Sequence, residues 1–272
     1  MSGMVFVKLG GSVITDKAQP ETPRPEVIAR LAGEVAAALA TRPDLQLVLG
    51  HGSGSFGHVT ARHCGTRQGV RTATDWRGFA QVAAVAARLN RLVTDAFLSA
   101  GVPVWSLQPS ASAQCRGGEL VSLETAPVEG ALARGLVPLL YGDVALDEAQ
   151  GGTIISTEQI FDYLARRLYP ARLVLVGAVD GVFEGDPLRD PSARHVPEIS
   201  AANWAAVRAT LGGSYVPDVT GGMRAKVEEM VGLVRDLPGL TVQLISGERV
   251  GALEVMLRHP EKAAGGTVIR WG

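Results

Sequence analysis

Residues 5–12 read V-F-V-K-L-G-G-S, a short β-branched run followed directly by two glycines and a serine. The run predicts a buried strand, because it is short, apolar and rich in valine. Glycines at the end of a strand let backbone N–H groups approach a phosphate that a Cβ atom would keep away, and Lys8 adds a cation beside them. For this motif alone, a tight turn with a solvent-facing Lys8 is an equally good interpretation.

Short apolar runs like this one alternate with longer amphipathic stretches along the whole chain. This alternation predicts an α/β fold, a three-layer αβα sandwich with a largely parallel central sheet. The expected strands are residues 5–7, 45–49, 102–105, 136–140, 172–176, 240–245 and 268–269. The expected helices are residues 25–40, 74–100, 125–134, 156–168 and 222–237. Gly117-Gly118 predicts a β-hairpin inserted outside the alternation.

Two lobes are expected, residues 1–169 and 170–272, because a second group of strands and helices begins after Pro170. No low-complexity linker separates them. The resulting prediction is two lobes that share one fold rather than two independent domains.

The amino-acid composition and the net charge exclude several classes of protein. The 272 residues are 46% hydrophobic and 19% charged, which is enough to bury a core and excludes a disordered chain. With 26 basic and 27 acidic residues, the formal net charge is -1, so no overall cationic field favours nucleic acid or a membrane surface. Charge also interrupts every longer apolar stretch, and we expect no membrane segment. Cys64 and Cys115 form no disulfide framework or metal-binding spacing, so the cytoplasm is the expected compartment.

A second glycine loop follows the second predicted strand. Residues 51–58 read H-G-S-G-S-F-G-H and contain the spacing G-x-G-x-x-G. A dinucleotide-binding fingerprint also needs an acidic residue about 20 positions later, at the end of the next strand. The candidate, Asp75, opens a long helical stretch instead, which argues against a dehydrogenase. A Walker A loop is absent, because the sequence contains no Gly-Lys dipeptide.

A third loop, residues 218–223 with the sequence D-V-T-G-G-M, leads into a predicted helix that carries Lys226 on its first turn. A helix N-terminus offers unpaired N–H donors and the positive end of a dipole, and a lysine placed there adds a full charge. The segment is therefore a candidate phosphate cradle. A capped surface helix whose Lys226 pairs with Glu229 is an equally good interpretation of this segment by itself.

In chain order, the segments V-K-L-G-G-S-V-I-T-D-K, H-G-S-G-S-F-G-H, Y-G-D-V and D-V-T-G-G-M-x-x-K resemble the amino acid kinase superfamily, and within it the isopentenyl phosphate kinases. The resemblance spans nearly the whole chain. The first and last segments are shared widely in the superfamily. The ending G-S-F-G-H at His58 is narrower, because it is similar to isopentenyl phosphate kinases and to the related fosfomycin kinases. The resemblance implies ATP-dependent phosphorylation of isopentenyl phosphate, a step of isoprenoid synthesis, by a homodimer built across the N-terminal lobe.

By position, the resemblance also implies the roles of individual residues. The implied catalytic residues are Lys8, Lys17, His58 and Lys226. The implied ATP contacts are Lys8, Gly10, Gly11, Ser12, Gly54, Gly222 and Lys226. The implied acceptor contacts are Ser53, His58 and Thr157. The acceptor would bind the N-terminal lobe and the nucleotide the C-terminal lobe, with Mg²⁺ held mainly by ATP phosphates and no metal site on the protein.

Two segments depart from the family pattern. Where the family commonly reads S-G-D-[DQ], residues 156–159 read S-T-E-Q, so the acceptor contact usually made by the glycine falls on Thr157. The same four residues form a capping box that starts the next predicted helix. Where the family commonly reads T-D-V-D-G, residues 177–181 read G-A-V-D-G, and a carboxylate expected near the nucleotide is missing. That role is not assigned to Asp180.

The chemistry of the implied acceptor needs no general base, because the second pKa of a phosphate monoester lies near 6 and the attacking oxygen is already ionised at neutral pH. We therefore expect His58 to donate a hydrogen bond to the acceptor phosphate, with a structural role as the alternative. For Asp143 in Y-G-D-V, orienting a loop, reaching the lysines and capping a turn all stay open.

The apolar stripe of Phe79, Val82, Ala83 and Ala86 is more typical of core packing than of a slot for the acceptor tail. Two other functions also fit the motifs. One is a kinase of the same fold that acts on a phosphonate such as fosfomycin or on another small phosphomonoester. The other is a non-catalytic protein that binds a nucleotide or another anion.

Overall fold

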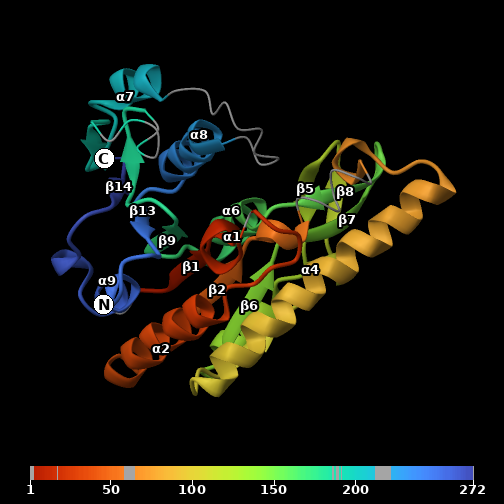
Figure 1. Cartoon of the computed structure of the whole chain (residues 1–272), viewed down its shortest axis with the longest axis horizontal. Coiled ribbons are helices and arrows are strands. Elements are labelled where there is room, and N and C mark those ends of the chain that lie inside the picture. The colour runs from red at the N-terminus through yellow and green to blue at the C-terminus, as the bar shows by residue number, and fades with distance from the viewer. Residues whose placement is uncertain are drawn as a thin grey trace.

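The structure is a computed structural model that describes residues 3–16, 18–57, 65–185, 187, 190, 192–211 and 222–271. Its main sheet has eight strands: β1 (Val5–Leu9), β2 (Leu47–His51), β3 (Val104–Ser106), β6 (Val137–Tyr141), β9 (Arg172–Gly177), β12 (Glu198–Ile199), β13 (Thr241–Ser246) and β14 (Thr267–Ile269). They lie in the order β12-β14-β13-β9-β1-β2-β6-β3. The sheet contains strands from both sides of Pro170 and crosses the middle of the molecule (Figure 1).

Neighbouring strands are parallel except β13 and β14. The carboxyl ends of β1, β2, β9 and β13 therefore meet at one edge of the sheet. β1 lies at the point where the chain leaves to one side for β2 and returns on the other side with β9, and Lys8 is in register with Gly50 and Leu175. In open α/β sheets, ligands bind outside the carboxyl ends of strands at such a switch point.

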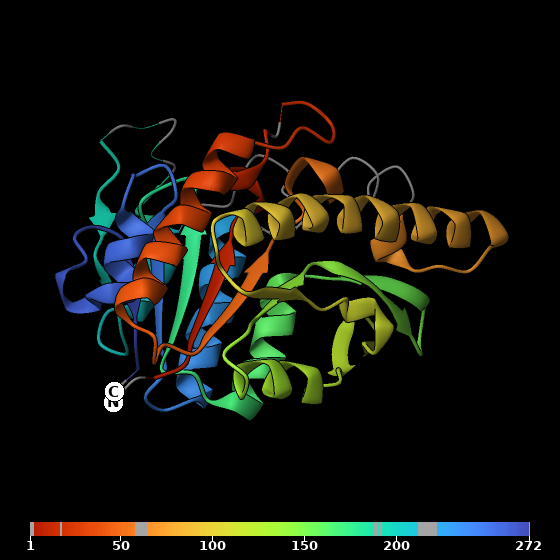
Figure 2. The same ribbon diagram turned by 90° about the horizontal axis from the view of Figure 1, so that it is seen from below.

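Helices cover both faces of the sheet (Figure 2). One face packs against α2 (Pro25–Thr41), α4 (Ala73–Ser99) and α9 (Ala252–Arg258). The other packs against α5 (Ala126–Leu132), α6 (Thr157–Leu168), α7 (Trp204–Thr210) and α8 (Gly222–Asp236). The prediction of a three-layer αβα sandwich is confirmed.

Alternation along β1 decides which face carries its lysine. Val5, Val7 and Leu9 belong to the core on the α2 and α4 side, whereas Phe6 packs in the core on the α6 and α8 side. Because successive side chains of a strand point to opposite faces, Lys8 lies on the same side as Phe6. The lysine therefore faces α6 and α8.

A second, four-stranded sheet extends the molecule beneath the far end of α4 (Figure 2). Its strands are β4 (Gln114–Arg116), β5 (Glu119–Ser122), β7 (Asp143–Asp147) and β8 (Gly151–Ile155), in the order β5-β4-β7-β8. The hairpin predicted at Gly117-Gly118 is confirmed between β4 and β5, and both glycines have positive φ. The buried carboxylate of Asp147 accepts hydrogen bonds from both of their N–H groups.

The seven predicted strands and five predicted helices are present with small differences at their ends. The sequence prediction missed β7, β8 and β12, and also α7, α9 and α1 (Gly11–Ile14). α1 has four residues and cannot show helical periodicity. A two-stranded sheet of β10 (Val182–Phe183) and β11 (His195–Val196) was also not predicted.

The capping prediction is confirmed, and the structure adds a second capping box. Ser156 and Gln159 form a capping box at the start of α6. Thr72 and Asp75 form another at the start of α4, so Asp75 serves a helix N-terminus rather than a ribose. Among the described residues, no helix is long and apolar enough to cross a membrane.

Phe97 and its neighbour Leu98 on α4 give a test of the core beneath α4. Phe97 is fully buried, whereas Leu98 is 50% exposed. Phe97→Ala should lower the free energy of unfolding by about 3–5 kcal/mol, because it removes buried apolar contacts and leaves a cavity. Leu98→Ala should change it by no more than about 0.5 kcal/mol. Urea unfolding of both variants measures the difference, and equal losses would contradict this assignment of the core.

Candidate active site

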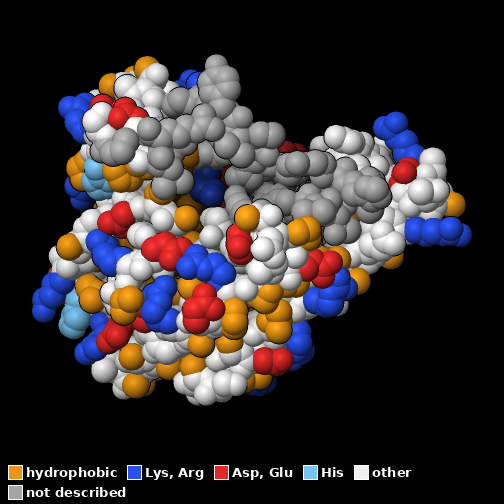
Figure 3. All heavy atoms as spheres, viewed as in Figure 1, with side chains coloured by type: hydrophobic (Ala, Val, Ile, Leu, Met, Phe, Trp, Pro, Cys, Tyr) orange, Lys and Arg blue, Asp and Glu red, His pale blue; other side chains and the backbone are white. Residues whose placement is uncertain are grey.

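A cleft of about 260 Å³ opens at the carboxyl ends of β1, β2, β9 and β13. Lys or Arg atoms lie in a hollow in the region of α8 and α1, and elsewhere on that face acidic and basic side chains are interspersed (Figure 3). The described charged residues that line the cleft are Lys8, Arg67, Lys226 and Glu158. Three cations and one acid give this part of the lining a positive charge, although the whole chain is almost neutral.

The first two glycine loops contact each other through their backbones. A Cβ atom on Gly11 would lie 2.6 Å from Gly54 Cα, and one on Gly54 would lie 2.6 Å from the Gly11 carbonyl oxygen. Gly54 also has a φ of +48°, which favours glycine. The glycines are therefore required for the two loops to approach each other, as well as for any approach of a ligand.

The Thr15 hydroxyl connects the two loops by hydrogen bonds. It donates to the Gly11 carbonyl at 2.7 Å and accepts from the Ser55 N–H at 2.9 Å. Within the described part of the chain, the N–H groups of Gly11, Ser12, Ser53 and Gly54 have no hydrogen-bond acceptor. These donors can bind an anion in the cleft.

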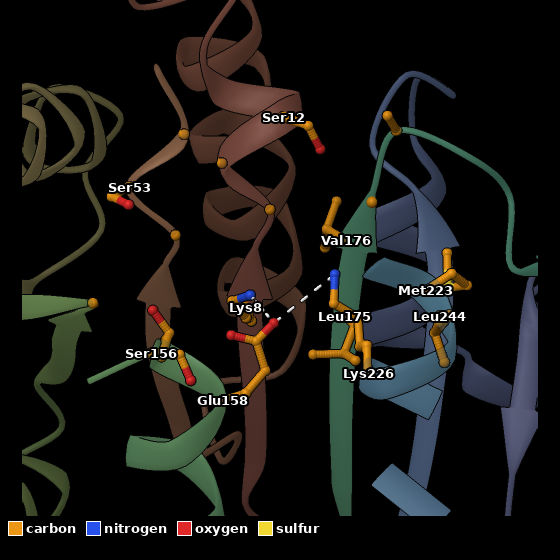
Figure 4. Close-up of a pocket in the computed structure, with 18 of the residues that line it drawn as sticks. Lys8, Ser12, Ser53, Ser156, Glu158, Leu175, Val176, Met223, Lys226 and Leu244 are labelled. Carbon is orange, nitrogen blue, oxygen red and sulfur yellow. Dashed lines mark hydrogen bonds and ion pairs between the residues drawn. The ribbon is translucent and has the colours of Figure 1, made fainter. Parts of the chain in front are cut away.

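Lys8, Glu158 and Lys226 form a charged group at the floor of the cleft (Figure 4). Glu158 Oε1 accepts a hydrogen bond from Lys8 Nζ and lies 3.9 Å from Lys226 Nζ. Lys8 and Glu158 are buried, and Lys226 is partly exposed. The three residues come from β1, α6 and α8, so the group connects three elements that are distant in sequence.

The group is held in its ionised form. Burial by itself would raise the pKa of the Glu158 carboxyl, but Lys8 and Lys226 outweigh burial and hold that pKa below its usual range. Burial and the neighbouring Lys226 lower the pKa of Lys8, and Glu158 opposes this change. One carboxylate between two cations leaves a net positive charge for a ligand.

The predicted site residues converge. The predicted residues that line the cleft are Lys8, Gly10, Gly11, Ser12, Ser53, Gly54, Thr157, Gly222 and Lys226. Lys17, His58 and residues 218–221 lie outside the described residues. The ion pair that the structure gives Lys226 is with Glu158 rather than with Glu229.

Thr157 is buried at the first turn of α6, and its hydroxyl donates to the His51 carbonyl at 2.6 Å. The hydroxyl hydrogen is therefore already used. Any contact that Thr157 makes with a ligand would come from its backbone or its oxygen lone pairs.

Sequence reasoning missed two charged residues among the described lining of the cleft. Glu158 was interpreted as part of a capping box, although it stands at the position of the acid in the S-G-D-[DQ] pattern, and that signal could have found it. Arg67 belongs to no motif that we considered. Its place in the cleft follows from the packing of residues 66–68 beside β8.

Two aspartates left open by the sequence have structural partners. Asp143 is buried and accepts hydrogen bonds from the N–H groups of Ser110 and Val144, which favours the loop-orienting role. Asp180 accepts from the Ser246 N–H and from Arg249, both at 3.0 Å, and is not among the residues that line the cleft. The described lining beside β9 and β13 is apolar or backbone: Leu175, Val176, Ala178, Val179, Leu244 and Ile245.

Backbone donors, two lysines on a shared carboxylate, and a cleft at a topological switch point define a protein that binds anionic groups, such as a phosphotransferase. The family model described as "Amino acid kinase family" matches residues 3–245. The chain therefore belongs to the amino acid kinase family, whose members transfer phosphoryl groups from ATP.

Among the known proteins similar to this chain are several isopentenyl phosphate kinases. The isopentenyl phosphate kinase of Methanothermobacter thermautotrophicus is 32% identical over 94% of this chain and 100% of its own length. That of Haloferax volcanii is 38% identical over 85% of this chain and 88% of its own. A crystal structure described as "X-ray structures of isopentenyl phosphate kinase" superposes with a TM-score of 0.83 at 30% identity, and covers 98% of this chain and 99% of that one.

Glu158→Gln tests the charged group. The substitution keeps the shape of the side chain but leaves Lys8 buried without its counter-charge, so the free energy of unfolding should fall by about 3–5 kcal/mol. Because the pKa of Glu158 is depressed in the folded state, its contribution is present at neutral pH. The difference from the wild type should narrow as the pH falls through that pKa. Denaturant unfolding at several pH values measures both effects.

Asp162→Asn is the matched control, one turn further along α6. Asp162 pairs with Arg166 at a partly exposed position. Loss of such a pair should cost no more than about 1 kcal/mol. If the two variants were equally stable, the buried ion pair would not stabilise the site.

Proposed function

We propose that this protein transfers the γ-phosphoryl group of ATP to isopentenyl phosphate, giving isopentenyl diphosphate and ADP. The observation that carries the proposal is the convergence of two glycine loops and the Lys8–Glu158–Lys226 group on one cleft. The similarity to isopentenyl phosphate kinases over almost the full length supports this choice of acceptor. The reaction would supply a precursor for isoprenoid synthesis.

The reaction brings two polyanions together. An ionised oxygen of the acceptor phosphate attacks the γ-phosphorus, and a new O–P bond forms. The bond from the γ-phosphorus to the β–γ bridging oxygen breaks, and its electron pair leaves with ADP. The transition state is loose and carries its charge on the transferred group, so catalysis depends on positive charge and alignment rather than on a base.

The charged group meets this requirement. Lys8 and Lys226 both approach the carboxylate of Glu158, which fixes the two ammonium groups. Glu158 is the one carboxylate among the described residues of the cleft, and it is already paired with the lysines. The donors present therefore fit a Mg²⁺ ion that arrives with ATP and is held mainly by nucleotide phosphates, where it would neutralise charge.

The remaining residues divide between the two substrates. Gly11, Ser12 and Gly54 would surround the transferred group with N–H donors, and Gly222 with Lys226 would contact the ATP phosphates. Gly10 would line the path of that group, since its own N–H already donates to the Val176 carbonyl. Ser53, His58 and Thr157 would hold the acceptor phosphate, and Lys17 would close over the site. Residues 1–169 would then bind the acceptor and residues 170–272 the nucleotide. A rise in acceptor KM for His58→Gln, with the KM for ATP unchanged, tests the acceptor assignment.

The acceptor tail has a candidate slot beside β8. Phe79, Val82 and Ala83 of α4 pack against Val144 and Ile154, and Ile154 also lines the cleft. The stripe is therefore a packed cluster, as its spacing predicts, and it also adjoins the site. This contact supports the proposal that the apolar tail lies against Ile154 with Phe79 behind it.

A cytoplasmic homodimer completes the proposal. Leu92 on α4 and Trp105 on the edge strand β3 are 45% and 46% exposed. Exposed large apolar side chains on adjacent elements are typical of a surface that another subunit covers. Light scattering of the purified protein measures the mass, and a monomer at micromolar concentration would contradict this part of the proposal.

One experiment tests the function against its alternatives. ADP release is measured with isopentenyl phosphate, fosfomycin and other small phosphomonoesters as acceptors. The proposal expects the highest kcat/KM with isopentenyl phosphate. A preference for fosfomycin would identify a phosphonate kinase, and ATP binding without ADP release with any acceptor would identify a non-catalytic protein. Either result would overturn the proposal.

Lys226→Ala should lower kcat by roughly 10²-fold or more, because it removes one cation that contacts the transferred group in the transition state. Steady-state kinetics with both substrates measures the effect. Arg224→Ala, on the same turn of α8 with an exposed side chain paired to Glu228, is the control and should leave kcat unchanged. A change confined to the acceptor KM would count against the role of Lys226.

Phe79→Ala should let the protein accept longer prenyl monophosphates, because removal of the ring opens space behind Ile154. The measurement is kcat/KM for a series of prenyl monophosphates of increasing chain length. Leu92→Ala, at an exposed position of the same helix, should leave the profile unchanged. If both variants showed the wild-type profile, the tail would not lie along α4.

A further inference from the structure

His51 ends β2 at the start of the second glycine loop, and both nitrogens of its ring have a partner. It is 1% exposed. Nδ1 lies 3.1 Å from the Gly52 carbonyl oxygen, and Nε2 lies 3.2 Å from Oδ1 of Asn90. The Tyr141 ring stacks on the imidazole at 5.6 Å with an angle of 7° between the ring planes. This arrangement fixes the ring in one orientation.

The environment keeps His51 neutral. Burial lowers the pKa of His51 to about 4, and the nearby Lys8 adds to the shift. A neutral imidazole carries one N–H. Both ring nitrogens face an oxygen, but the side-chain amide of Asn90 can be turned end for end, whereas the backbone carbonyl of Gly52 can only accept. The arrangement that satisfies both contacts therefore places the proton on Nδ1, where it donates to Gly52. Nε2 is then an acceptor.

Asn90 completes the chain of hydrogen bonds. As placed, its Oδ1 faces His51 Nε2, and its Nδ2 lies 2.5 Å from Ser106 Oγ. The two ends of an amide have nearly the same shape and are assigned from their partners. Because Nε2 accepts, the NH₂ end of Asn90 belongs toward His51 and its oxygen toward the Ser106 hydroxyl. The chain Ser106–Asn90–His51–Gly52 is then fully satisfied, and it connects β3 and α4 to the loop.

Because the peptide bond is planar, the contact between His51 and the Gly52 carbonyl also fixes the direction of the next N–H group in the loop. The Gly52 carbonyl and the Ser53 N–H belong to one trans peptide unit and point in opposite directions. His51 lies on the α4 side of the sheet, where Asn90 is located, and it draws the Gly52 carbonyl to that side. The Ser53 N–H must then point away from α4, toward the side of the sheet that carries Lys8.

We propose that His51 is a positioning residue whose Nδ1–H holds the Gly52–Ser53 peptide so that the Ser53 N–H donates to the phosphate of the acceptor. This rests on the proposed function for the identity of the acceptor. Ser53 lines the cleft, and its N–H has no acceptor within the described part of the chain. His51 itself does not touch the substrate and transfers no proton.

Two substitutions at His51 separate positioning from packing. His51→Asn removes the ring but places an amide nitrogen near the position of Nδ1, so the donor to Gly52 is kept. His51→Phe keeps the ring on Tyr141 and removes the donor. The proposal expects His51→Phe to lower kcat/KM for isopentenyl phosphate by roughly 10-fold or more, the effect of one lost hydrogen bond to a charged group. It expects His51→Asn to stay within a few-fold of the wild type, and the KM for ATP to change in neither variant.

A role in packing alone predicts the reverse order, with His51→Phe active and His51→Asn impaired, and that result would overturn the inference. Equal losses in acceptor and ATP KM would overturn it as well. Thermal unfolding of both variants shows whether a loss of activity reflects loss of the fold.

Nitrogen-15 NMR of the wild-type protein tests the positioning role of His51 even if a variant does not fold or the acceptor has been misassigned. The His51 ring must carry its proton on Nδ1, and the Ser53 amide signal must move when isopentenyl phosphate or inorganic phosphate is added. A proton on Nε2 alone, or a Ser53 signal that neither ligand moves, would overturn the role of His51. By contrast, an unresponsive ADP-release assay with a responsive Ser53 amide would overturn the proposed acceptor and leave the role of His51 standing.

Discussion

The ion pair between Lys8 and Glu158, with Lys226 beside it, is the interaction on which the site depends. Two lysines whose charge a phosphate needs cannot lie close together in a partly buried cleft without compensation. Glu158 compensates one of the two positive charges, so the group stays ionised and keeps a net charge of the right sign for a ligand. Because the three residues come from β1, α6 and α8, the same contact joins the two halves of the chain at the point where the reaction would occur.

The glycine loops add backbone N–H donors, held in place by close packing, to this charge. Gly11 and Gly54 are in backbone contact, Thr15 bonds to both loops, and Gly50 at the end of β2 lies against Phe161 and Thr157 of α6. A Cβ atom at any of these glycines would move a loop or a helix. The backbone donors of these loops are therefore fixed by packing before a ligand arrives, which is the condition for electrostatic stabilisation without a cost of reorganisation.

Much of this arrangement could be predicted from the chain itself. The apolar runs gave the strands of the main sheet because parallel strands buried on both faces are continuously hydrophobic. The second sheet was predicted less well, since β7 and β8 carry polar residues and glycines and have no such run. Among the site residues, Lys8, Ser53 and Lys226 were found through motifs, whereas Glu158 was assigned to helix capping because Ser156 and Gln159 explain the segment locally. Arg67 gave no local signal at all.

The sequence by itself determined which segments would be strands, that glycine loops would follow two of them, and that cations would accompany the loops. These properties depend on residues within a few positions of one another. Only the tertiary structure decided that Glu158 pairs with Lys8 across 150 positions, that Asp180 bonds to Ser246 and Arg249 rather than facing the cleft, and that His51 orients the Gly52–Ser53 peptide. The physical reason is that a charge or a hydrogen bond takes its partner from whatever side chain packing brings within about 3–4 Å, and the order of residues along the chain does not specify that neighbour.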